Sequence, residues 1–189
     1  FFKIGKYSDA SKLITDAIRV SEHDDWRALL AMGCILSDGQ QEYSSAKSYF
    51  DRSSELNPTS TQINLNKSQN LILLKSYAEA ETLLKSILDK MATVEDRSTK
   101  IITIIMLICL RYLNKDESDS DNERLIVDLL RLLDLKDSSL VDWNFHNLQS
   151  TVDKSQDLKN GDKEFLKNLL SIPGKKPTYE SKSLKKKIQ

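Results

Sequence analysis

The side chains that most often carry chemistry in proteins are few in this chain of 189 residues. It contains two histidines, His23 and His146, and two cysteines, Cys34 and Cys109. None of them has the short spacing of a zinc site or of a Cys-x-x-Cys pair. We therefore expect no metal site and no cysteine–histidine nucleophile, and we interpret both histidines as surface or boundary residues.

The remaining polar residues offer no catalytic motif either. The five glycines are isolated from one another, so the chain has no glycine-rich loop of the kind that binds phosphate groups. The adjacent acids Asp24 and Asp25 precede a helical pattern and are better explained as helix caps. These features predict a protein that is not an enzyme and that uses no cofactor and no small-molecule substrate.

Ser118 and Ser120 are candidate phosphorylation sites. Each has an acidic residue three positions later, Asp121 and Glu123, the pattern that an acid-directed kinase accepts. Phosphates there would precede a predicted helix N-terminus, where negative charge is stabilised. The alternative is a solvated loop in which Asp121 or Asn122 caps the helix.

Residues 172–189 form a basic C-terminal tail. Residues 175–189 contain six lysines and one glutamate, a net charge of +5, whereas the whole chain is formally neutral. The residues that could meet an anionic partner are Lys182, Lys185, Lys186 and Lys187. This cluster is interpreted as an RNA contact, as a nuclear-import signal or simply as a solubilising segment.

The rest of the sequence is dominated by helical patterns. Apolar residues make up 39% of the chain, and glycine and proline are scarce, which is typical of an all-α protein. Between Ala10 and Ile18, apolar residues recur at the three- and four-residue spacing of a helix that buries one face. Such spacing predicts helices over residues 7–20, 26–36, 42–56, 60–74, 76–90, 97–112, 125–135, 140–152 and 165–170.

The most apolar run, from Ile101 to Leu110, is about half as long as a membrane-spanning helix. We expect a buried helix there and no membrane span. The two cysteines lie inside predicted helices without a disulfide pattern, which fits a reducing compartment. A cytoplasmic location is therefore expected, with the nucleus as the alternative because of the lysine tail.

A short apolar pattern repeats along the first half of the chain. It consists of a tyrosine, an alanine three positions later and a large apolar residue four positions further on. Its three copies are Tyr7, Ala10 and Ile14; Tyr43, Ala46 and Phe50; and Tyr77, Ala80 and Leu84. Successive copies are thirty-six and thirty-four residues apart, a period that indicates stacked helix pairs.

The segment from Trp26 to Pro58 resembles the tetratricopeptide repeat (TPR), a thirty-four-residue pair of antiparallel helices. The positions that match the family are Leu29, Met32, Gly33, Leu36, Tyr43, Ala46, Phe50 and Pro58. One extra residue lies in the turn near Gln40, and the next repeat has Lys67 and Ser68 where leucine and glycine are usual. The resemblance implies a right-handed superhelix, or solenoid, of antiparallel helix pairs.

The resemblance covers residues 1–90 and extends to residue 171 as a general helix-pair pattern. We expect one TPR-like domain over residues 1–171. Its best repeats are residues 25–58 and 59–92, and two degenerate pairs follow at residues 95–135 and 138–171. The basic tail completes the chain.

In the TPR family the first helix of each pair lines the concave side, so the resemblance implies a partner-binding groove. It places in that groove Arg27, Leu30, Cys34, Gln62, Leu65, Gln69 and Ile72. This apolar strip with polar groups along it suits an extended peptide or an amphipathic helix. Two alternatives remain: a register error of one residue, which would leave Leu30, Leu65 and Ile72 packed internally, or occupation of the groove by the chain's own C-terminal segment.

These expectations favour a non-catalytic scaffold or adaptor within a multiprotein complex, which binds a partner peptide or helix in its concave groove. One alternative is a protein subunit of an RNA–protein particle whose lysine-rich tail contacts RNA. Another is the regulatory TPR arm of a larger enzyme.

Overall fold

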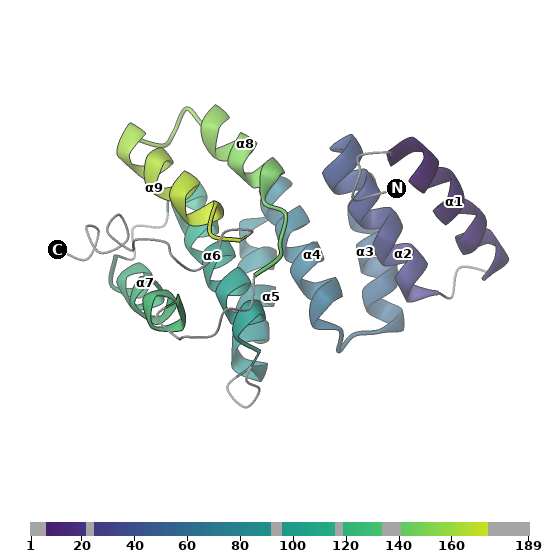
Figure 1. Cartoon of the computed structure of the whole chain (residues 1–189), viewed down its shortest axis with the longest axis horizontal. Helices are drawn as coiled ribbons and strands as arrows, with labels where there is room; N and C mark the ends of the chain where they lie inside the picture. Colours follow the sequence, from purple (N-terminus) through teal and green to yellow (C-terminus); the bar gives the residue numbers. More distant parts are fainter. Residues whose placement is uncertain (1–6, 22–24, 92–95, 116–118, 134–140, 174–189) are drawn as a thin grey trace. The chain divides into compact units, whose positions relative to one another are not determined.

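The computed structural model describes residues 7–21, 25–91, 96–115, 119–133 and 141–173. Within these residues the protein consists of helices joined by short connections, without a β-strand (Figure 1). The predicted all-α class is therefore confirmed. No helix in this described part is long and apolar enough to cross a membrane.

The chain divides into two compact units, Phe1–Leu83 and Leu84–Gln189. The single TPR-like domain over residues 1–171 stays a prediction. The boundary after Leu83 falls within the helix Tyr77–Lys90, inside the predicted repeat 59–92.

The first unit is built from antiparallel neighbours. Its elements are α1 (Tyr7–Val20), α2 (Trp26–Cys34), the π-helix η2 (Ile35–Gln40), α3 (Tyr43–Leu56), α4 (Thr61–Leu73) and the beginning of α5 (Tyr77–Lys90). Ser53 Oγ, near the end of α3, donates to the Trp26 carbonyl at the start of α2 at 2.8 Å. Asn70 Nδ2, near the end of α4, donates to the Tyr43 carbonyl at the start of α3 at 2.9 Å.

Polar residues fix the ends of these helices. The Asp25 side chain caps α2 by accepting from the Arg27 N–H at 2.9 Å, as the sequence predicts. The Ser60 hydroxyl caps α4 in the same way. After α4, Lys75 adopts the left-handed conformation, with φ of 61°, and reverses the chain toward α5.

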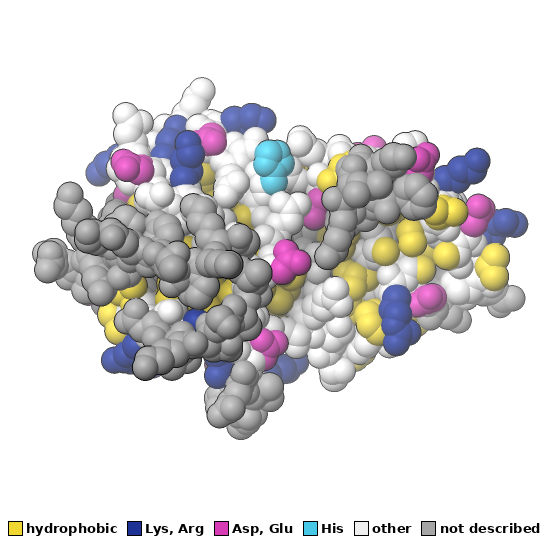
Figure 2. Space-filling model, viewed as in Figure 1, with side chains coloured by type: hydrophobic (Ala, Val, Ile, Leu, Met, Phe, Trp, Pro, Cys, Tyr) yellow, Lys and Arg dark blue, Asp and Glu magenta, His cyan; other side chains and the backbone are white. Residues whose placement is uncertain are grey.

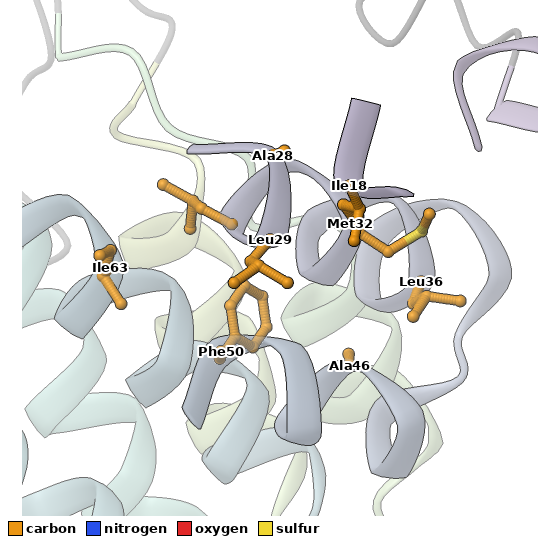
Figure 3. Close-up of a cluster of buried hydrophobic side chains, with 9 residues drawn as sticks. Ile18, Ala28, Leu29, Met32, Leu36, Ala46, Phe50 and Ile63 are labelled. Atoms are coloured by element: carbon orange, nitrogen blue, oxygen red, sulfur yellow. The ribbon is translucent and has the colours of Figure 1, made fainter. Parts of the chain in front are cut away.

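The core of the first unit lies between α2 and α3 (Figure 3). Ala46 is fully buried and Phe50 is only 1% exposed. A Cβ added at Gly33 would lie 2.5 Å from Cε1 of Phe50. Gly33 therefore allows the backbone of α2 to pack directly against the Phe50 ring.

The connection between α2 and α3 differs from the predicted turn. The helix does not end near Leu36 but continues as η2 to Gln40. Because a π-helix bonds each N–H to the carbonyl five residues back, its wider turn accommodates one additional residue. A Cβ at Gly39 would lie 2.4 Å from the Tyr7 ring, so this end of η2 packs closely against α1.

The second unit contains a helix whose middle is buried on all sides. Its elements are the end of α5, α6 (Arg97–Asn114), α7 (Asp119–Leu133), α8 (His146–Lys154) and α9 (Asn160–Leu170). Each residue from Ile101 to Leu110 in α6 is at most 4% exposed, which confirms the predicted buried helix. Arg97 Nε donates to the Leu132 carbonyl at 2.7 Å and joins the start of α6 to the end of α7.

The helices α7, α8 and α9 begin at residues other than those predicted, and α7 starts at Asp119 rather than at Leu125. Asn144 Oδ1 accepts from the His146 N–H at 3.0 Å, and α8 begins there rather than at Leu140. Asn160 and Gly161, expected to separate two helices, form the first turn of α9. Glycine is tolerated at that exposed position because no neighbouring side chain must pack there.

Candidate functional site

A pocket of about 580 Å³ lies in the first unit between α1, α2 and α4. Its described wall consists of Ala10, Leu13, Ile14, Trp26, Arg27, Leu30, Ala31, Cys34, Ile35 and Gln62. The wall is mainly hydrocarbon, and Arg27 is the charged residue among those described. The volume falls within the ~300–1,000 Å³ range of binding pockets in proteins.

Two features of the sequence shape this pocket. Ala10 of α1 and Ala31 of α2 have short side chains, which leave space between the helices. At the edge, the guanidinium carbon of Arg27 lies 4.4 Å from the centre of the Trp26 ring. This cation–π contact positions the exposed Arg27 side chain, while the Asp25 cap holds the Arg27 backbone N–H.

Cys34 links two walls of the pocket. Its thiol donates to Asn66 Oδ1 at 3.2 Å, and Asn66 Nδ2 donates to the Gln62 carbonyl at 2.8 Å. Burial and, to a smaller extent, the negative charge of Asp38 raise the pKa of Cys34 to about 12. The thiol is therefore protonated at neutral pH and acts as a weak donor rather than as a nucleophile.

Four of the seven predicted groove residues, Arg27, Leu30, Cys34 and Gln62, line this pocket, although Leu30 is only 6% exposed and also belongs to the buried core of the first unit. The other three lie in α4 and are packed: Leu65 is 3% exposed, Gln69 5% and Ile72 fully buried. Helix α4 is buried on more than one face. These three residues are therefore packed inside the first unit and do not line the pocket.

Sequence reasoning missed the contribution of α1, which supplies Ala10, Leu13 and Ile14 to the wall. The signal was present in the apolar pattern of this helix. Leu13 is 56% exposed and Val20 is 78% exposed, so the apolar residues of α1 extend beyond the face that α2 covers.

The two departures from the TPR pattern in α4 have structural partners. Lys67 Nζ lies 2.7 Å from Asp51 Oδ1 of α3, and the Ser68 hydroxyl donates to the Asn64 carbonyl at 2.7 Å. Lys47 approaches Asp51 Oδ2 at 2.9 Å and Glu79 of α5 at 3.6 Å. This ion-pair network connects α3, α4 and the start of α5.

Asp51 is the acidic residue that both lysines of this network contact. Burial opposes ionisation of its carboxyl group, but hydrogen bonds and charges from Lys47 and Lys67 outweigh burial and lower its pKa. The pKa of Lys47 is raised, chiefly by its hydrogen bond to Asp51.

The other candidate sites lie mostly outside the described residues. These are Ser118, His23 and the tail residues Lys182, Lys185, Lys186 and Lys187. Ser120 lies in the first turn of α7. His146 is exposed, as predicted for a surface residue. In the described part of the chain, no group of three or more acidic, histidine or cysteine residues could hold a metal ion.

No family model, no curated protein sequence and no solved structure matches this chain. The function of this chain therefore has to be inferred from the residues that line its pocket.

Proposed function

We propose that the protein is a non-catalytic adaptor whose first unit binds a segment of a partner protein in the pocket between α1, α2 and α4. The observation that carries this proposal is an apolar pocket of about 580 Å³ with Arg27 and Gln62 in its wall. Apolar side chains of a partner would gain about 25 cal/mol for each Å² removed from water. The two polar side chains would orient the bound segment.

The pairs α2–α3 and α4–α5 are proposed to be successive repeats of a TPR-like right-handed superhelix. Equivalent positions of the repeated motif support this assignment. Ala46 and Ala80 are both fully buried, and Phe50 and Leu84 are 1% and 0% exposed. Residues that recur at a fixed period and are buried alike are expected where helix pairs stack in the same way.

A binding role is favoured over catalysis by the chemistry of the wall. Its described members include no pair of acidic or basic groups that could exchange protons with a substrate. Its thiol, that of Cys34, stays protonated at neutral pH.

The proposal is tested by selecting peptides from a displayed random library on the full chain. Leu13→Arg and Ala31→Arg place a charge in the pocket wall and are expected to abolish binding of the selected peptides. Ala78→Arg is the matched control, because Ala78 is exposed on α5 and lies outside the pocket wall. Circular dichroism of each variant would verify folding. Selection of no peptide, or binding that survives Leu13→Arg and Ala31→Arg, would contradict the proposal.

A further inference from the structure

Helix α1 carries an apolar stripe that faces solvent. Leu13 is 56% exposed, Val20 is 78% exposed, and Ala17 between them is also exposed. At about 100° per residue these three positions fall within an arc of about 60° on the helix. They recur at the four- and three-residue spacing of one helical face, so they form a continuous ridge of two turns, about 10 Å long.

The stripe is continuous with the pocket. Leu13 belongs to both, and the next positions around the helix, Ala10 and Ile14, also line the pocket. One apolar surface therefore extends from the α2 wall across the pocket to the outer side of α1. Figure 2 shows apolar side chains gathered on the face formed by α1 and α2, with acidic and basic side chains along its margins.

The two margins of this surface have opposite charge. On the α2 side lies the exposed Arg27. On the outer side of α1, Asp9 and Asp16 are exposed, and they follow the stripe within the next ~40° around the helix. The exposed bases Lys12 and Arg19 lie a further ~40–60° away from the stripe. Asp16 lies 3.6 Å from Arg19, but both side chains are more than half exposed. Such a surface pair is weak and leaves the carboxylate available to a partner.

We infer that the partner segment is an amphipathic α-helix, with an acidic side chain facing Arg27 and a basic side chain facing Asp9 and Asp16. This inference rests on the proposed function and specifies its partner. A helix is favoured over an extended peptide because it satisfies its own backbone hydrogen bonds. The apolar wall offers few groups that could pair with the backbone of an extended peptide. Grooves that bind helices contact apolar side chains spaced three and four residues apart, which is also the spacing of the apolar residues in the α1 stripe.

The test uses the full chain and fluorescently labelled synthetic peptides of about 20 residues, long enough to form a helix. The first probe has a leucine stripe with glutamates along one side and lysines along the other. The second carries a proline in its middle, which prevents the helix. Two further probes carry only glutamates or only lysines on both sides. Fluorescence anisotropy measures each dissociation constant.

The mixed-charge helical probe is expected to bind most tightly. Arg27→Glu makes both margins acidic and should weaken its binding roughly five-fold, the effect of about 1 kcal/mol at a solvent-exposed charge. Adding Asp9→Lys and Asp16→Lys to Arg27→Glu inverts both margins. Binding should then recover, because the helix can dock in the reverse direction. Arg131→Glu, the same charge change at an exposed side chain of α7, should have no effect.

Several outcomes would overturn the inference. Equal or tighter binding of the proline probe would exclude a helical partner and leave the proposed function intact. Binding of no probe, together with failure of the peptide selection, would overturn both. A dimer in sedimentation equilibrium that Leu13→Arg dissociates would show that a second copy covers the stripe. Binding that requires removal of residues 1–6 would show that the chain's own start occupies it.

Discussion

At the scale of single residues, the contact between Gly33 and Phe50 leaves no room for a side chain at position 33. In an exposed helix, replacing glycine by alanine is stabilising by roughly 0.5–1 kcal/mol. At Gly33 the added methyl group would lie 2.5 Å from the buried Phe50 ring. Overpacking of this kind costs about 1–3 kcal/mol, so Gly33→Ala is expected to lower the free energy of unfolding, as measured by urea denaturation.

Gly161 provides the matched control for Gly33. It also lies in a helix, but nothing lies within 4 Å of an added Cβ. Gly161→Ala is therefore expected to be neutral or stabilising, by up to about 1 kcal/mol. If Gly33→Ala and Gly161→Ala changed the free energy of unfolding in the same direction, the result would contradict the close packing of α2 on Phe50.

The second prediction at this scale concerns Asp51 and pH. Its folded-state pKa is lowered below the ordinary value of 3.8, so the ionised carboxylate stabilises the folded state at neutral pH. This contribution is lost as the pH falls through the lowered pKa. Because Asp51 is 35% exposed, Asp51→Asn is expected to cost only about 1 kcal/mol at pH 7.

The measurement is the difference in unfolding free energy between the wild type and Asp51→Asn, followed from about pH 7 to about pH 3. The difference should shrink as the solution becomes acidic. Asp16→Asn removes a carboxylate whose pair with Arg19 is more than half exposed and serves as the control at neutral pH. A difference that stays constant down to pH 3 would argue against the ion pairs of Asp51 with Lys47 and Lys67.

At the scale of elements, most helices could be predicted because their apolar residues recur with a helical period. The predicted segments for α1, α3, α4 and α5 end within one residue of the observed bounds. The start of α8 and the π-helix could not be predicted in this way. They depend on local hydrogen bonds, such as that from the His146 N–H to Asn144. The spacing of apolar residues does not predict such bonds.

Pairing of α2 with α3 depends on the small residue Ala46 in the first turn of α3. Ala46 is fully buried within the core between α2 and α3. Ala46→Leu is expected to force the two helices apart and to cost about 1–3 kcal/mol of stability. Thermal or chemical denaturation measures this loss. Ala78→Leu, the same change at an exposed helical position, should have little effect, and equal stability of both variants would count against this packing.

At the scale of the whole molecule, the site was only partly predictable. The residues of α2 that line the pocket follow from the helix-pair pattern, whereas the contribution of α1 depends on which neighbours cover that helix. Periodicity indicates which face of a helix is apolar. It does not indicate how much of that face another element buries, as the exposed Leu13 of α1 and the buried Ile72 of α4 both show.

The division after Leu83 leads to a prediction about cooperativity. Since each unit is compact in its own right, destabilising one core should affect chiefly the helices around it. Phe50→Ala removes a ring that is 1% exposed and is expected to cost about 3–5 kcal/mol. In hydrogen–deuterium exchange, the amides of α2 and α3 should lose protection, while those of α6 and α9 should largely keep theirs. Leu166→Ala in the core of the second unit should give the reverse pattern. Equal loss of protection in both units from either variant would instead show that the chain unfolds as one cooperative body, since each substitution removes contacts from only one core.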